Sequence, residues 1–272
     1  NLLEPGDKVI VCQNGVFGGR MQQNVERCGA TAVMVQDTWG KQTDLNKLED
    51  ALKATPDAKA VAFVHAETST GVRNDAKAIC ALAKRWQIDA IYSGTQKCLS
   101  CVPGLSPVSF SQEAVEVIKS RKSKVQSWFL DMELVMGYWG QGGKRAYHHT
   151  APVNSLYALH ESLRILHNEG LSSAFLRHQE MHVALKVGLE KIGLEFVVDQ
   201  AYRLPQLNMV SIPQGVDDAQ VRSQLLNEYG LEIGAGLGEL AGKVWRIGLM
   251  GYGCNKKNVD YCVNALTSVL AR

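Results

Sequence analysis

Lys8-Val-Ile-Val-Cys12 is a short apolar run near the start of the chain, and Asn14-Gly15 and Gly18-Gly19 follow it. An amphipathic stretch from Arg20 to Cys28 comes next. An apolar run, a glycine-rich segment and an amphipathic stretch, in that order, predict a buried strand, a turn and a helix. This unit decides the fold class because the following residues repeat it.

The same alternation continues along the chain, with strand candidates at residues 31–35 and 60–64 and helix candidates at residues 45–55 and 75–85. Strands that alternate with helices predict an α/β fold with a mainly parallel sheet. In such sheets, ligands bind beyond the carboxyl ends of the strands. We therefore expect a binding site built from three post-strand segments, residues 13–19, 65–71 and 93–97.

The pattern changes after residue 154. Two long helical stretches precede strand candidates, and the remaining elements are mixed, with expected bounds of 155–167, 172–192, 195–198, 207–212, 217–229, 244–247 and 257–270. This predicts a smaller α+β domain after a boundary near Gly170. We expect a large domain at residues 1–169 and a small domain at residues 170–272.

Composition excludes several classes of function. A net charge of +2 over 272 residues gives no broad basic surface for nucleic acid. No run of eighteen apolar residues predicts a membrane span, and residues 1–7 do not resemble a signal peptide. Seven scattered cysteines fit reduced thiols, so we expect a cytoplasmic protein, or a peroxisomal or mitochondrial one in a eukaryote.

Three short motifs do not support metal, redox or nucleotide chemistry. Cys98 and Cys101 form a CxxC, but no second pair follows at zinc spacing. Residues 234–238 lack the spacing of a dinucleotide fingerprint, and residues 142–144 lack the rest of a P-loop. The adjacent His148 and His149 would point in different directions, so we expect them to pack in the core or at an interface rather than bind metal.

Lys97 is a lone amine after the predicted strand of Asp89-Ala-Ile-Tyr-Ser, and its simplest interpretation is a solvated loop lysine. However, Ser93-Gly-Thr-Gln-Lys97, Pro103-Gly104 and Val108-Ser-Phe-Ser111 resemble the cofactor-lysine segment of class V (fold-type I) pyridoxal-phosphate aminotransferases. The alanine–glyoxylate / serine–pyruvate group is the most similar. Six further segments match in order, at residues 1–7, 14–18, 67–71, 138–140, 147–150 and 242–248.

The resemblance implies roles for seven residues. Lys97 would form a Schiff base with pyridoxal phosphate and move a proton between the substrate Cα and the cofactor C4′. Gln96 would bind the phosphate, and Tyr147 and Thr150 would reach it from a partner subunit of a homodimer. Tyr147 could instead only pack in the core.

The other three residues would contact the ring or the substrate. Phe17 would stack on the pyridine ring. Thr68 would touch that ring, or else cap the following helix. Arg246 would bind the substrate α-carboxylate through two parallel hydrogen bonds, or else form a buried structural ion pair.

The implied reaction is transamination between alanine or serine and glyoxylate or pyruvate. A bulkier donor such as 3-hydroxykynurenine remains open, and so does a noncatalytic binding or scaffold homologue. A cysteine-desulfurase-like lyase would need a cysteine on a mobile catalytic loop, and neither Cys98 nor Cys101 is placed for that role.

The match is interrupted in two places. Relatives carry a glycine-rich phosphate-binding loop before the point that matches Asn1. They also carry a core strand, with the aspartate that pairs with the pyridine nitrogen, between the counterparts of Gln87 and Ile88. Asp89 cannot replace that aspartate because it has its own counterpart. Either these segments belong to a longer polypeptide, or the protein lacks them and is inactive. We favour the first, because removing a central strand would uncover apolar faces.

Overall fold

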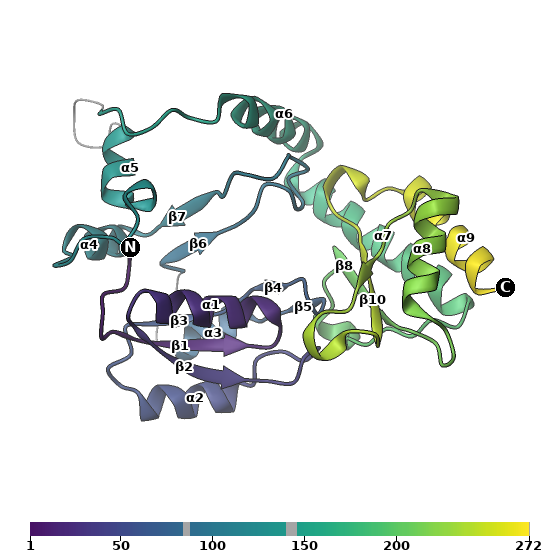
Figure 1. Cartoon of the computed structure of the whole chain (residues 1–272), viewed down its shortest axis with the longest axis horizontal. Coiled ribbons are helices and arrows are strands. Elements are labelled where there is room, and N and C mark those ends of the chain that lie inside the picture. Colours follow the sequence, from purple (N-terminus) through teal and green to yellow (C-terminus); the bar gives the residue numbers. More distant parts are fainter. Residues whose placement is uncertain (84–87, 140–145, 272) are drawn as a thin grey trace.

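The computed structural model describes residues 1–83, 88–139 and 146–271. Its N-terminal part contains a parallel three-stranded sheet of β1 (Lys8–Gln13), β2 (Thr31–Gln36) and β3 (Ala60–Ala62), in the order β2-β1-β3 (Figure 1). The chain crosses over between these strands through α1 (Val16–Arg27) and α2 (Leu45–Ala54). The predicted α/β winding is therefore present.

Alternate residues of β1 face two separate apolar clusters. Ile10 and Cys12 pack with Leu48 of α2 and Ile79 of α3 (Ala76–Leu82). Val9 and Val11 pack on the other side with Val25 of α1. Because the side chains of a strand alternate between faces, helices on both sides bury Val9 to Cys12 of β1.

Helix α1 begins earlier than the sequence predicts. Gly18 and Gly19, expected in a turn, instead lie in its first turn, which starts at Val16, and Asn14 and Gly15 precede it. A Cβ on Gly18 would lie 2.7 Å from the Cα of Gln13, so the helix can approach β1 this closely only with glycine there. The expected strand at residues 60–64 is also shorter, since β3 ends at Ala62.

Two antiparallel hairpins follow β3. One joins β4 (Ala66–Glu67) to β5 (Val72–Arg73), and the other joins β6 (Ala90–Tyr92) to β7 (Val108–Phe110). Within the described residues, neither hairpin pairs with the β2-β1-β3 sheet. The strands that were expected to form one sheet are therefore divided into two, with a break between β3 and β6. As a result, Ile91 of β6 is 58% exposed.

The interrupted match falls at this split. Gln87, on one side of the predicted join to Ile88, lies outside the described residues, as do Gly140 and the predicted turn at residues 142–144. After β7 come α4 (Gln112–Lys119), η1 (Trp128–Leu130), α5 (Met132–Tyr138) and α6 (Val153–Glu169).

The C-terminal part is built on an antiparallel sheet of β8 (Leu207–Ser211), β9 (Gly234–Ala235) and β10 (Val244–Gly248), in the order β8-β10-β9. Trp245 is fully buried in its core, among side chains from α7, α8 and α9. An expected strand at residues 195–198 is absent as a regular strand, because Phe196 makes only a single bridge, to Val210. The elements are α7 (Leu171–Lys191), η2 (Gln200–Tyr202), β8 (Leu207–Ser211), α8 (Asp218–Tyr229), β9 (Gly234–Ala235), η3 (Gly238–Leu240), β10 (Val244–Gly248), η4 (Gly251–Gly253) and α9 (Lys256–Leu270).

The β4-β5 segment connects the two parts. Val72 is buried in one cluster with Met209 and Val244, and the N–H of Leu204 donates to the carbonyl of Gly71 (2.9 Å). The post-strand segment at residues 65–71 therefore lies against the C-terminal sheet. Within the described ranges, no helix combines the length and apolar character needed to cross a bilayer.

Candidate active site

A buried carboxylate at the start of α1 organises the first part of the site. Glu67 is fully buried and accepts hydrogen bonds from the backbone N–H of Phe17 (3.1 Å) and from the hydroxyl and N–H of Ser69 (2.6 and 3.0 Å). The N–H of Val16 in turn donates to Ser69 Oγ (2.9 Å). The unpaired amides at a helix N-terminus stabilise negative charge, which makes this a suitable place for a buried acid.

Two asparagines, Asn14 and Asn74, hold together the segments that lead into α1 and out of β5. Asn14 and Asn74 exchange hydrogen bonds between their side-chain amides (3.0 and 3.2 Å), and both are buried. Asn74 also donates to the carbonyl of Val64 (2.8 Å) and accepts from the N–H of Thr43 (2.9 Å). A fully bonded buried amide pair holds neighbouring backbone segments in one arrangement.

Arg246 of β10 reaches the segment that contains Thr68. Its Nη1 donates to the carbonyl of Thr68 (3.2 Å) and its Nε donates to the carbonyl of Ala235 (2.7 Å). Burial lowers the pKa of the Arg246 guanidinium, and no carboxylate among the described residues pairs with it. The guanidinium therefore keeps donors that an anionic ligand can use.

Lys97 lies in a loop after β6. The buried Thr95 anchors this loop, since its hydroxyl donates to the carbonyl of Val102 (2.9 Å). The N–H of Ser100 donates to the carbonyl of Lys97 (2.9 Å). Lys97 and Gln96 are both exposed, and the described residues offer the Lys97 amine no hydrogen-bond or ion-pair partner. The amine is thus available to react.

The end of β6 lies near Glu67, the last residue of β4. Partial burial raises the pKa of the Tyr92 phenol, and the negative charge of Glu67 raises it further. Asp89, at the start of this segment, is engaged elsewhere, because its carboxylate accepts a hydrogen bond from Ser111 Oγ (3.2 Å). The structure thus brings Phe17, Thr68 and Arg246 into one network through Glu67 and its neighbour, and the end of β6, which precedes the Lys97 loop, lies near that network.

Tyr147 and Thr150 lie apart from this network. Their hydroxyls are 2.7 Å apart and exposed, and neither bonds to Gln96 or Lys97 in the described part of the chain. Next to them, His148 is buried and stacks on Trp128 with ring centroids 4.1 Å apart. The two hydroxyls therefore belong to a surface rich in aromatic rings.

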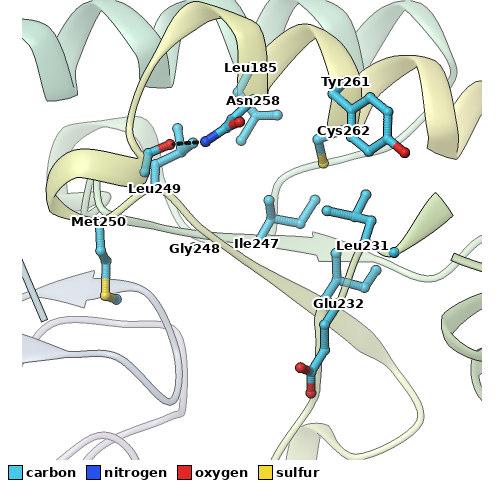
Figure 2. Close-up of a pocket in the computed structure, with 13 residues that line it drawn as sticks. Leu185, Leu231, Glu232, Ile247, Gly248, Leu249, Met250, Asn258, Tyr261 and Cys262 are labelled. Carbon is cyan, nitrogen blue, oxygen red and sulfur yellow. Dashed lines mark hydrogen bonds between the residues drawn. The ribbon is translucent and has the colours of Figure 1, made fainter. Parts of the chain in front are cut away.

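A separate cavity of about 530 Å³ lies in the C-terminal part, between α7, α9 and the end of β10 (Figure 2). Met250, Asn258 and Tyr261 are among its lining residues, and none of the seven predicted site residues lines it. Met250 and Gly253 of the segment at residues 250–254 line it, and Tyr252 of the same segment bonds to Ser100 in the Lys97 loop. It is thus distinct from the network around Arg246.

The family model for aminotransferase class-V matches residues 1–88 and 83–256. The chain belongs to the class V aminotransferases. The two matched stretches overlap at residues 83–88, which lie in the sequence between β3 and β6. The family assignment confirms the resemblance found in the sequence, and with it an aminotransferase that uses pyridoxal phosphate.

Characterised relatives match almost the whole chain. (S)-Ureidoglycine–glyoxylate transaminase of Bacillus subtilis is 34% identical, with 100% of this chain and 74% of the relative covered. Alanine–glyoxylate aminotransferase of Callithrix jacchus is 38% identical, with 99% of this chain and 71% of the relative covered. The latter alignment spans 295 positions against 272 residues here, so that relative carries internal residues without a counterpart.

Solved structures give the same result for the fold. Alanine–glyoxylate aminotransferase from Nostoc sp. matches with a TM-score of 0.93 and 42% identity, covering 99% of this chain and 76% of the other. Ureidoglycine–glyoxylate aminotransferase from Bacillus subtilis matches with a TM-score of 0.95 and 35% identity, covering 100% and 75%. These neighbours confirm the expected fold-type I α/β class.

A cysteine desulfurase from Thermococcus onnurineus is also similar in structure, with a TM-score of 0.72 but only 13% identity. That likeness shows the shared fold alone, and it does not support the lyase alternative.

The residues present fit pyridoxal phosphate. The cofactor needs a free amine, a flat apolar face and hydrogen-bond donors for its phosphate. Lys97 has an exposed amine with no partner among the described residues, Phe17 has a partly exposed ring and a backbone bond to Glu67, and Gln96 has an exposed amide.

Sequence reasoning missed Glu67, although it lies inside a quoted motif. The signal was an acid that follows a predicted strand and directly precedes three hydroxyl residues, Thr68, Ser69 and Thr70. Such an acid is unlike a surface carboxylate because nearby backbone N–H groups and hydroxyls can satisfy it when buried.

Proposed function

We propose that this protein transfers an amino group from a small L-amino acid, alanine or serine, to glyoxylate or pyruvate. The relatives named above share glyoxylate in their names, which supports an acceptor of this kind. The observation that carries the proposal is Arg246, a partly buried guanidinium bound to Thr68 with no acidic partner in the described residues. Such a group suits the carboxylate that every amino acid and 2-oxo acid presents.

Lys97 would hold the cofactor aldehyde and then move a proton between the substrate Cα and the cofactor C4′. Bound pyridoxal phosphate supplies the electron sink that makes the Cα proton removable. The lack of an ion-pair partner for the Lys97 amine within the described residues supports this role, because the amine must lose a proton to attack or to act as a base.

Phe17 would stack on the ring, with its backbone fixed by Glu67. Thr68 would contact the ring, and its carbonyl would help aim Arg246. Gln96 would donate to the phosphate, joined by the hydroxyls of Tyr147 and Thr150 from a partner subunit.

A homodimer is part of this proposal. The residues around Tyr147 expose large apolar side chains that a monomer would leave in water, namely Trp128, Phe129, Leu130 and Tyr147, each at least half exposed. Contiguous apolar surface of this kind marks protein–protein interfaces. A second copy on this face would place each pair of hydroxyls where it can serve the other subunit's site.

We also propose that residues 1–169 form the cofactor-binding domain and residues 170–272 the small domain. Gly170 lies between α6 and α7 with a φ of 83°, a conformation that favours glycine. All seven cysteines are free thiols, which supports a reducing compartment such as the cytoplasm.

A second donor is supported by a specific observation. The (S)-ureidoglycine–glyoxylate transaminase of Bacillus subtilis is 34% identical over the whole of this chain, close to the 38% of the Callithrix jacchus alanine–glyoxylate enzyme, which supports ureidoglycine as a candidate donor beside alanine. A donor panel of alanine, serine, ureidoglycine and 3-hydroxykynurenine with glyoxylate or pyruvate would separate these possibilities.

The enzyme proposal is tested by borohydride reduction of the protein with pyridoxal phosphate, followed by peptide mapping. We expect one pyridoxyl group on Lys97, and none in Lys97→Arg, with Lys119→Arg as a surface control that still labels. Labelling spread over surface lysines, with none at Lys97, would refute the proposed role of Lys97.

A further inference from the structure

A chain of hydrogen bonds links helices α6 and α7 to the Lys97 loop through the turn formed by residues 250–254. The loop end of this chain is Ser100, whose Oγ accepts a hydrogen bond from the backbone N–H of Tyr252 (2.7 Å). Ser100 in turn donates its N–H to the carbonyl of Lys97 (2.9 Å). The turn thus contacts the lysine loop three residues from the reactive amine.

The contact between turn and loop is tight and strained. Ser100 has a φ of 60°, a left-handed conformation that a non-glycine residue rarely adopts. Gly251 also has a positive φ of 57°, and a Cβ there would collide with Ser100 Oγ and lie 2.9 Å from the carbonyl oxygen of Cys98. Strained backbone persists only where its surroundings hold it in place.

Arg177 of α7 holds the other side of the turn. Its Nη1 donates to the carbonyls of Gly251 (2.8 Å) and Cys254 (2.6 Å). Its Nε and Nη2 form a two-pronged pair with the carboxylate of Glu169 at the end of α6 (2.5 and 2.8 Å). A guanidinium can fill these directions at once because its donors form a rigid fork.

The next residue on α7 completes the support. His178 is buried, and its Nε2 accepts the backbone N–H of Gly251 (3.0 Å). Its Nδ1 therefore carries the proton and donates to the carbonyl of Ala174 (2.6 Å). On the cavity side, Asn258 donates to the carbonyl of Gly253 (2.8 Å). Asn258 and a dashed line from its side chain can be seen in Figure 2.

We propose that Arg177 and His178 are positioning residues for Lys97, acting through the turn at residues 250–254 and through Ser100. This inference rests on the proposed role of Lys97. If the turn moved, it would break its hydrogen bonds to Ser100 on one side and to Arg177 and His178 on the other. The position of the C-terminal part therefore determines the position of the Lys97 loop. α6 and α7 join the two parts of the chain, so a change in their relative position would be transmitted to Lys97.

The test compares Arg177→Gln with Arg164→Gln. Arg164 makes the same two-pronged pair with a glutamate, Glu161, but on the surface of α6 and away from the turn. Ser100→Ala removes the acceptor for Tyr252 without touching α7, so it tests the same link if Arg177→Gln fails to fold.

The first measurement is hydrogen exchange of the cofactor-free protein. In Arg177→Gln and Ser100→Ala we expect the amides of residues 97–102 to exchange about tenfold faster, as the loss of one or two hydrogen bonds implies, with no change in Arg164→Gln. The second is the pH midpoint of the visible absorbance of bound pyridoxal phosphate, which should shift in the first two variants. A purely structural role would lower the Tm and leave that midpoint unchanged.

Two failures are distinguishable. If borohydride labels Lys97 in the unaltered protein but exchange at residues 97–102 and the pH midpoint are unchanged in both variants, the positioning role is wrong. If borohydride does not label Lys97 at all, the proposed role of Lys97 is wrong, and the positioning role falls with it.

Discussion

The buried carboxylate of Glu67 accepts a hydrogen bond from the backbone N–H of Phe17 at 3.1 Å. This bond joins two segments that lie fifty residues apart in the sequence, each after its own strand. It fixes the first turn of α1 against the loop that carries Thr68. The aromatic ring proposed to stack on the cofactor and the loop proposed to contact that ring are therefore positioned together.

Glu67→Gln should weaken both folding and cofactor binding. The new amide would point an N–H at the N–H of Phe17 or of Ser69, so a buried donor would lose its acceptor. Such a loss costs about 1–3 kcal/mol. We expect a lower free energy of unfolding in urea and a higher Kd for pyridoxal phosphate, measured by absorbance titration.

Glu49→Gln is the matched control. Glu49 lies on the surface of α2, where it pairs with Lys53, so its change should alter stability by less than about 1 kcal/mol. If Glu67→Gln lowered stability but left the Kd for the cofactor at the control value, Glu67 would serve the fold alone.

Arg246→Lys should reduce kcat/KM for every amino-acid donor and oxo-acid acceptor. Lysine keeps the charge but has no fork to bind a carboxylate in two places, and it cannot also hold the carbonyls of Thr68 and Ala235. Losing a charge-assisted hydrogen bond of about 1.5–3 kcal/mol corresponds to roughly a 10- to 150-fold loss.

Steady-state kinetics with Arg222→Lys provide the comparison, because Arg222 pairs with Asp218 on the other side of the C-terminal part. Equal losses for the two variants would contradict a direct role for Arg246 in carboxylate binding.

Stability should fall on mild acidification because of His182. This histidine is buried and its Nδ1 lies 2.6 Å from Asn208 Oδ1. Burial lowers the pKa of His182 below 6.5. The positive charges of Arg203 and Lys186 lower this pKa further, whereas the hydrogen bond to Asn208 raises it in part. The unfolded chain therefore takes up the proton first. The stabilising contribution is complete above pH 6.5 and is lost as the pH falls from there through the folded-state pKa.

The size of this loss is about 1.4 kcal/mol for each unit by which the pKa is lowered. Urea unfolding between pH 7.5 and 5 should show it in the unaltered protein and in His167→Gln, an exposed control. His182→Gln should flatten this part of the curve. An equally steep curve in that variant would assign the acid sensitivity to other groups.

A shared site predicts complementation between subunits. Lys97→Ala and Tyr147→Ala should each be nearly inactive alone. In a hybrid dimer one site would carry both defects and the other neither, so unfolding and refolding an equal mixture should restore about a quarter of the activity. A mixture no more active than its components would show that Tyr147 does not act across an interface.

The periodic parts of the fold could be predicted from sequence alone. The alternation of Val9, Ile10, Val11 and Cys12 between two apolar clusters is a local pattern, and so is the spacing of the helices that cover them. The start of α1 could not be predicted, because it depends on Gly18 meeting the backbone of Gln13. A glycine required for packing looks the same in the sequence as a glycine in a turn.

The site could be predicted only in part for a similar reason. Lys97 and Arg246 are found from the motifs around them, whereas the bond from Arg246 to Thr68 spans 178 positions and has no local signal. Glu67, Ser100 and Arg177 act through backbone groups of distant segments. Such contacts depend on tertiary structure, which residue spacing does not encode.

The split between β3 and β6 gives the last prediction. A parallel sheet is normally continuous and buried, yet β6 pairs only with β7 in the described residues and leaves Ile91 and Tyr92 58% and 63% exposed. The family model also matches in two stretches that overlap at residues 83–88. We expect the protein in the cell to carry a further strand between Gln87 and Ile88, with an acid for the pyridine nitrogen.

A tryptic digest tests this directly, because cleavage after Arg85 and Lys97 would release Trp86–Lys97 as one peptide only if the two segments are joined. Its absence, with longer peptides in its place, is the expected result. Its detection would mean that the sheet stays split, and would favour a noncatalytic homologue that binds pyridoxal phosphate weakly or not at all.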